Sequence, residues 1–189
     1  MELIDKLKLR EAFSRASRMY EVKAALQKEI AEELFEKVNR DVKNAQTILD
    51  IGMGTGFLTG KLKEAFSNAE IAGLDFAYGM ASYVKERSHD IKVIQADAEA
   101  LPFKDELFDL IVSNLAYQWV PRLEIAFRDT HRILTNKGSF FFTCFGSETL
   151  KELRASFKYV EPFFKEDLRI PNYRSIMRTL RRCGFRRVE

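Results

Sequence analysis

A glycine-rich loop between an apolar segment and a helix-patterned segment is the feature that most limits the fold of this chain. Residues 47–51 read Thr-Ile-Leu-Asp-Ile, which is typical of a short buried strand, and residues 52–56 read Gly-Met-Gly-Thr-Gly. Glycines at such a turn allow positive φ angles and let a ligand approach the backbone closely. The loop therefore predicts a ligand site just beyond the end of a strand.

The glycine spacing narrows the class of ligand. A dinucleotide-binding loop is G-x-G-x-x-G, whereas this loop is G-x-G-x-G and Phe57 stands where the third glycine would be. A P-loop would need Gly-Lys-Ser/Thr, which is absent from this loop. Asp50 directly before the glycines would repel a pyrophosphate and would favour a ligand with an ammonium group. S-adenosyl-L-methionine (SAM) carries such a group and has no phosphate, and a tight turn without a ligand is the alternative.

Apolar runs alternate with helix-patterned segments along most of the chain. This alternation predicts an α/β, Rossmann-like fold with a mostly parallel sheet and helices on both faces. Residues 3–40 read as helix throughout, so we expect a single domain 1–189 with an N-terminal helical lobe at 1–44 and a core at 45–189. The strands are expected at 47–51, 70–75, 91–95, 108–113 and 139–145, and the helices at 57–66, 78–88, 122–134, 147–158 and 172–182.

Acidic residues follow the second and third predicted strands. Asp75 ends the second strand, where a carboxylate can accept hydrogen bonds from ribose hydroxyls. Asp97 follows the third strand and is placed to accept from an adenine amino group, while the N–H of Ala98 can reach the ring. A helix cap at Asp75 and a loop acid without a ligand at Asp97 are the alternatives.

These segments together resemble the successive motifs of class I SAM-dependent methyltransferases. The resemblance rests on DIGMGTG at 50–56, LD at 74–75, QADAEALPF at 95–103 and FDLIVSN at 108–114. It implies a seven-stranded sheet and a SAM site, with the methionine end at the glycine loop, the ribose at the second strand and the adenine at the third. The cofactor-binding residues that it implies are Asp50, Gly52, Met53, Gly54, Asp75, Phe76, Met80, Asp97, Ala98, Asn114 and Leu115.

Further segments resemble one branch of that family, the malonyl-acyl carrier protein O-methyltransferases of biotin synthesis (BioC). They are FSRA at 13–16 with Tyr20, and SNLAYQW at 113–119. This resemblance implies methylation of the free carboxyl of a malonyl group on an acyl carrier protein. A carboxylate is ionised at neutral pH and needs no general base. A cation to orient it would help, so Arg15 and Arg122, with Tyr20, are the positioning candidates.

The carboxyl-terminal part of the chain supports two expectations. Relatives continue through a sixth and a seventh strand, so we expect the C-terminal strands to be missing, with 185–189 as the opening of a sixth strand. Residues 169–187 carry seven arginines and no acid, which predicts a docking patch for an acidic partner, either a carrier protein or nucleic acid. A solvated helix face is the alternative.

Composition excludes several function classes and leaves others open. The chain shows no apolar run near the roughly 18 residues of a membrane span and no signal-peptide pattern, so a cytoplasmic protein without membrane contact is expected. Cys144 and Cys183 fit no metal spacing, and no metal is expected. Other acceptors stay open as alternatives (a small metabolite, a quinone precursor or RNA), as does a SAM-binding protein without catalysis.

Overall fold

A five-stranded parallel sheet forms the centre of the molecule. The computed structural model describes residues 5–146, 149 and 172–189. The strand order is β3-β2-β1-β4-β5, and every pairing between neighbouring strands is parallel. The strands are β1 (Thr47–Ile51), β2 (Glu70–Asp75), β3 (Lys92–Gln95), β4 (Phe108–Asn114) and β5 (Leu134–Thr143).

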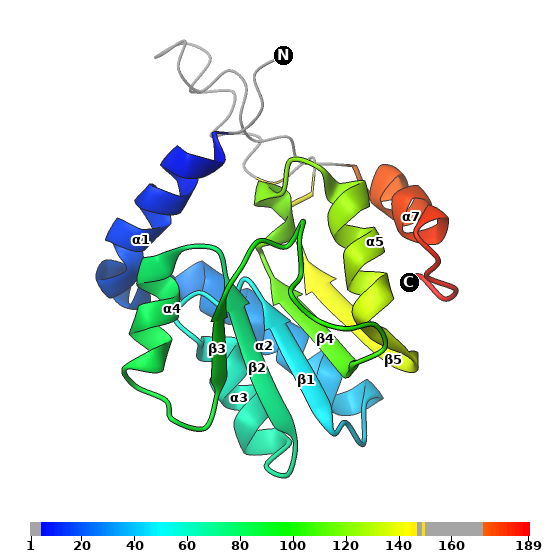
Figure 1. The fold of residues 1–189 in the computed structure, drawn as a ribbon, viewed down its shortest axis with the longest axis horizontal. Coiled ribbons are helices and arrows are strands. Elements are labelled where there is room, and N and C mark those ends of the chain that lie inside the picture. Colours follow the sequence, from blue (N-terminus) through cyan, green and yellow to red (C-terminus); the bar gives the residue numbers. More distant parts are fainter. Residues whose placement is uncertain (1–4, 147–148, 150–171) are drawn as a thin grey trace.

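Helices cover both faces of this sheet (Figure 1). They are α1 (Lys6–Lys23), α2 (Ala25–Asp41), α3 (Phe57–Ala65), α4 (Tyr78–Lys85), the short η1 (Tyr117–Trp119), α5 (Leu123–Ile133) and α7 (Tyr173–Arg182). The predicted α/β, Rossmann-like fold, a parallel sheet with helices on both faces, is thereby confirmed. The boundary between a lobe at 1–44 and a core at 45–189 stays a prediction.

Alternate side chains of the central strands pack into two hydrophobic cores, one on each face of the sheet. Leu49 and Ile51 of β1 pack with Phe127 and Ile133 of α5, while Ile48 packs against the side of the sheet that α2 and α3 cover. Successive side chains of a strand point to opposite faces, so an unbroken apolar run marks a strand buried on both faces.

Three segments differ most from the expected structure, while other bounds shift by one to three residues. The helix predicted over 3–40 is broken at Ala24, a buried residue with ψ 38° that separates α1 from α2. The strand predicted from 139 begins at Leu134, which pairs with Phe108 before a register shift. Residues 185–189 form no strand; Phe185 instead packs against His131 and Phe140.

Three further expectations concern a predicted helix, membrane spans and the two cysteines. The helix predicted at 147–158 lies outside the described residues. No helix among the described residues is long and apolar enough to cross a membrane. Cys144 and Cys183 are free thiols.

Candidate active-site cleft

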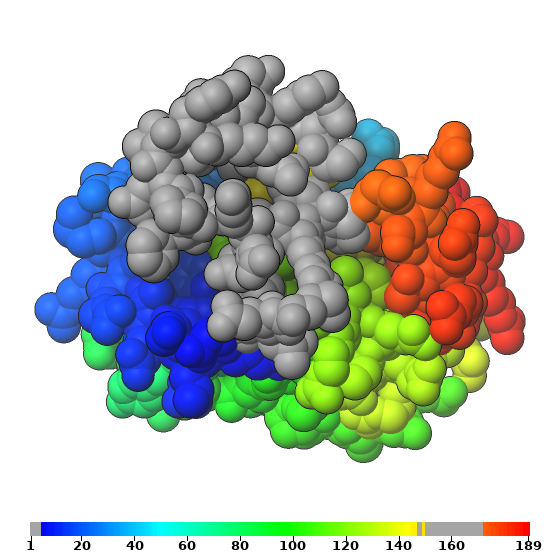
Figure 2. Space-filling view, turned by 90° about the horizontal axis from the view of Figure 1, so that it is seen from above, coloured from blue at the N-terminus to red at the C-terminus, as the bar shows by residue number. Residues whose placement is uncertain are grey.

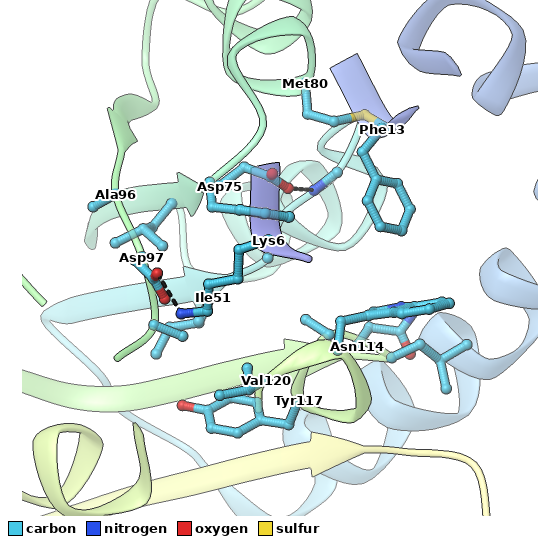
Figure 3. A pocket seen from close by; sticks show the side chains of 18 of the residues that line it. Lys6, Phe13, Ile51, Asp75, Met80, Ala96, Asp97, Asn114, Tyr117 and Val120 are labelled. Carbon is cyan, nitrogen blue, oxygen red and sulfur yellow. Dashed lines mark hydrogen bonds and ion pairs between the residues drawn. The ribbon is translucent and has the colours of Figure 1, made fainter. Parts of the chain in front are cut away.

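A cleft opens where β1, β2, β3 and β4 end, and α1 lies across it (Figure 3). Parallel strands deliver their carboxyl ends to one edge of a sheet, which is where ligands of such folds bind. Together with the solvent at its mouth, the cleft holds about 780 Å³ of empty space. The predicted residues that line it are Tyr20, Gly52, Gly54, Asp75, Phe76, Met80, Asp97, Ala98, Asn114 and Leu115.

The glycine loop is held in a shape that other residues would resist. Gly52 and Gly54 have φ of +74° and +55°. A Cβ on Gly52 would lie 2.3 Å from the Cβ of Ala116, so a side chain has no room there. The N–H groups of Gly52 and Met53 both donate to the carbonyl of Leu74, at 2.7 and 3.0 Å, which fastens the loop to β2. Met53 itself lines an adjoining hollow beneath the loop.

Asp50 is a buried carboxylate with one satisfied oxygen. Its Oδ2 accepts a 2.6 Å hydrogen bond from the Thr59 hydroxyl, while its Oδ1 has no partner within the described part of the chain. Burial, reinforced by the negative charge of Asp75, raises the pKa of Asp50 to about 7. The residue lines the same hollow as Met53, which makes it a candidate acceptor for a cationic group.

Asp75 occupies the end of β2 with both oxygens fixed by backbone donors. Its Oδ2 accepts from the N–H of Gly54 at 3.0 Å and its Oδ1 from the N–H of Ala77 at 2.8 Å. Burial raises its pKa to about 6. Because each carboxylate oxygen has a second lone pair, Asp75 can still accept from two hydroxyls in the cleft.

A charged network closes the cleft beyond β3. Lys6 of α1 places its Nζ 2.6 Å from Asp97 Oδ2 and 2.8 Å from Glu99 Oε2. Glu99 also binds Arg122, which donates its Nε and backbone N–H at 2.9 and 2.8 Å. The acid that the sequence assigns to adenine therefore already holds a lysine (Figure 3).

The turn after β4, formed by Asn114 and Leu115, has a strained backbone and is held by several hydrogen bonds. Leu115 has φ +52°, and its N–H reaches both the carbonyl and the hydroxyl of Thr143, at 3.2 and 3.0 Å. Asn114 donates to the carbonyl of Gln27 at 2.9 Å and accepts from Thr143 at 2.7 Å. Non-glycine residues with such φ values cluster at functional sites. The turn connects β4 with α2 and β5 beside the cleft.

One face of α1 supplies cleft residues that the sequence reasoning missed. Lys6 and Phe13 line the cleft along with Tyr20, at intervals of seven residues, which places them on one side of the helix. The Phe13 ring meets Phe76 and Trp119 edge-on, with centroids 6.3 and 5.6 Å apart. This seven-residue spacing was the available signal, but it says nothing about which surface the helix covers.

The three positioning candidates have different locations. Tyr20 lines the cleft. The pKa of its hydroxyl is raised mainly by burial and, to a smaller extent, by the negative charge of Asp75. Arg15 is absent from the lining; its side chain is 75% exposed and pairs with Glu11. Arg122 is also absent from the lining, because its guanidinium is engaged by Glu99. The structure thus brings only the tyrosine of this set to the cleft.

The residues present fit SAM. The unpartnered Asp50 oxygen can take the ammonium of a methionine group. Nothing lies within 4 Å of a Cβ added to Gly54, so a ligand can approach the bare backbone there. Asp75 retains lone pairs for a ribose, and Met80 and Phe76 offer an apolar wall. Among the described residues no cluster of side chains suited to a metal ion is found.

Known proteins match the chain in sequence and in fold. The family described as "Methyltransferase domain" matches residues 49–142. A malonyl-[acyl-carrier protein] O-methyltransferase from Geobacter sulfurreducens is 36% identical, over 99% of this chain and 73% of the relative. A relative of the same name from Methylococcus capsulatus is 37% identical, over 94% of this chain and 65% of the relative.

A solved structure agrees with the fold. A SAM-dependent methyltransferase from Thermotoga maritima superimposes with a TM-score of 0.72 at 24% identity, over 93% of this chain and 80% of that one. The match to the Geobacter relative and the architecture of the sheet lead to one conclusion. The chain belongs to the class I SAM-dependent methyltransferase family, alongside relatives named malonyl-[acyl-carrier protein] O-methyltransferase.

Proposed function

We propose that this chain binds SAM in the cleft and methylates the free carboxyl of a malonyl group attached to an acyl carrier protein. The observation that carries the proposal is the 36% identity to the Geobacter relative of that name over 99% of this chain. Because the chain spans 65% of the Methylococcus relative, the substrate and the partner are proposals rather than findings.

The cofactor roles follow the order of the strands along the cleft. We assign the methionine end to Asp50, Gly52, Met53 and Gly54, the ribose to Asp75, and the adenine to Asp97 and Ala98. Phe76, Met80, Asn114 and Leu115 form the walls between these ends. SAM supplies, when bound, a methyl group on a sulfonium. The protein's task is then to hold the acceptor in line with that methyl group and to exclude water.

The cleft suits an acceptor that is already ionised. Within the described part of the chain, no histidine lines it. Burial raises the pKa of Tyr20 and of Tyr117, and the hydroxyl of Tyr117 is bonded to Thr130, so neither tyrosine is suited to act as a base. A carboxylate acceptor, whose pKa is near 4, needs no proton removed. Positioning then supplies much of the rate.

Helix α7 offers a surface for an acidic carrier protein. The helix lies at the surface beside α5 (Figure 2). A hollow on it is lined by Arg174, Arg178, Arg181 and Arg182 together with Tyr173 and Met177. Charge complementarity of this kind raises the association rate more than the affinity. We therefore assign the predicted docking patch to α7 and to a carrier protein.

The docking role has its own test. The double variant Arg181→Glu, Arg182→Glu should slow methylation of the malonyl carrier by about tenfold or more at low salt, with the difference shrinking as salt rises. Methylation of a malonyl thioester without the carrier should be unchanged. Arg40→Glu is the matched control, since Arg40 is exposed on α2, which packs on the opposite face of the sheet from α7. Equal slowing with both substrates would reject docking at α7.

The function itself is tested by intact mass. The full chain is incubated with SAM and malonyl-acyl carrier protein, and the carrier is weighed by mass spectrometry. We expect the mass of one methyl group to be added to the malonyl carrier and none to an acetyl carrier, which lacks the free carboxyl. No gain, although SAM raises the melting temperature of the chain, would overturn the assigned acceptor.

A further inference from the structure

A second hollow continues the cleft beneath the glycine loop. The two spaces share Tyr20, Gly52, Gly54 and Asn114, so a ligand can extend from one into the other. The second hollow is bounded by α2, the loop and the start of α3. Among the described residues, its lining contains one acid, Asp50, and one base, Lys28.

The acid of this hollow requires a donor. The side chain of Asp50 is buried, and the Thr59 hydroxyl holds Oδ2 at 2.6 Å. Its Oδ1 has no hydrogen-bond partner among the described residues. A buried carboxylate oxygen without a donor is costly, and an ammonium group relieves that cost best.

The base is held at the rim with donor capacity to spare. Lys28 Nζ donates to the Glu21 carbonyl at 3.0 Å and pairs with the Glu21 carboxylate, and it lies 5.4 Å from the centroid of the Phe57 ring. An ammonium has three N–H groups, so one remains for a ligand. Glu21 is not among the residues that line the hollow, whereas Lys28 is.

From this pairing we infer that Lys28 of α2 is a specificity-determining residue that binds the carboxylate of the methionine head, opposite the Asp50 oxygen already assigned to its ammonium. Asp50 Oδ1 takes the ammonium and Lys28 Nζ takes the carboxylate. The inference rests on the proposed use of SAM and deepens it, because it assigns a residue of α2 to selecting the intact methionine head. Adenosine thioethers that lack the head, or that lack only its carboxylate, are discriminated against.

Ligand truncation combined with substitution tests this assignment. Isothermal titration of the full chain would compare S-adenosylhomocysteine with its decarboxylated analogue, which keeps the amine. In Lys28→Met, affinity for S-adenosylhomocysteine should fall by about tenfold or more, while affinity for the decarboxylated analogue should stay the same. In Asp50→Asn, affinity for both should fall. Lys28→Arg should restore the preference for the carboxylate.

A matched lysine controls for the loss of a cation near Phe57. Lys61 Nζ lies 5.6 Å from the same ring centroid, pairs with Glu32 and lines neither space, so Lys61→Met should leave both affinities unchanged. A circular dichroism melt of each variant checks its folding. Equal loss of both ligands in Lys28→Met, or no loss of either, would overturn the assignment while SAM use stands. If the unaltered chain fails to bind S-adenosylhomocysteine, the proposed function falls and the inference falls with it.

Discussion

The two ends of the cleft differ in how far the protein satisfies its own acids. At the far end, Asp97 and Glu99 hold Lys6, and Glu99 also holds Arg122. At the glycine-loop end, Asp50 keeps one buried oxygen without a donor among the described residues. At the first end the acids have cationic partners before any ligand arrives, and we call it the complete end. At the second, the incomplete end, a buried carboxylate oxygen is left for a ligand, so a ligand cation gains more there than at the first.

The largest expected effect on stability comes from distorting the glycine loop between the two spaces of the cleft. Gly52 lines both spaces, has φ +74°, and leaves its missing Cβ only 2.3 Å from the Cβ of Ala116. Gly52→Ala should therefore lower stability by about 2–4 kcal/mol, a drop in melting temperature of roughly 5–12 °C. Differential scanning calorimetry measures it.

Gly60→Ala is the matched control. Gly60 lies within α3 and nothing lies within 4 Å of its added Cβ, so the alanine should raise stability by about 0.5–1 kcal/mol. A Gly52→Ala chain as stable as the unaltered one would show that the loop is not held as the contact with Ala116 implies.

The next effect concerns the incomplete end and pH. Burial raises the pKa of Asp50 from 3.8 to about 7, so between these values the folded chain keeps a proton that the unfolded chain has lost. Stability is therefore greater at low pH and declines as pH rises through about 7, by an amount on the order of 2–3 kcal/mol between pH 5 and 8. Asp50→Asn should flatten the decline measured by urea unfolding from pH 5 to 8.

Asp75 does not confound that comparison, because its raised pKa contributes to both chains. Asp105→Asn, at a side chain that is 73% exposed and paired with Arg132, is the control and should keep the slope of the unaltered chain. An unchanged slope in Asp50→Asn would mean that Asp50 ionises as freely in the folded chain as in the unfolded one.

The smallest effect is expected at the complete end. Lys6→Met removes one of two cations from the buried Glu99 carboxylate, but Arg122 remains, so stability should fall by only about 1 kcal/mol, or roughly 2–4 °C. Lys8→Met serves for comparison, because Lys8 is 86% exposed and pairs only at 3.6 Å with Asp5; it should change the melting temperature by less than about 1 °C. Equal melting temperatures for the two variants would remove the distinction between the ends.

The strands and the loop residues were predictable because local pattern decides them. The bounds of β1 and β2 agree with the sequence analysis, and the acids at the strand ends lie at the cleft because parallel strands end at one edge. The break at Ala24 was not predictable, since the segment contains neither glycine nor proline to mark it.

The part of the cleft that α1 covers could not be predicted from the sequence, because it depends on tertiary packing. Lys6 and Phe13 reach the cleft because α1 packs on α4, where the backbone of Ser14 comes so close to Gly79 that an added Cβ would lie 2.3 Å away. The same packing leaves Arg15 of α1 exposed to solvent, whereas Arg122, just before α5, is held by Glu99 in the loop after β3. No periodicity within α1 shows which surface it will cover.

The glycine-loop end of the cleft, where Asp50 keeps an oxygen without a donor among the described residues, is the proposed site for the amino-acid head of the cofactor. The most direct test is isothermal titration of the unaltered full chain with S-adenosylhomocysteine and with 5′-methylthioadenosine, which share the adenosine but differ in the head. S-adenosylhomocysteine should bind at least about tenfold more tightly, because only its head reaches Asp50 and Lys28. Equal affinities for the two ligands would contradict it.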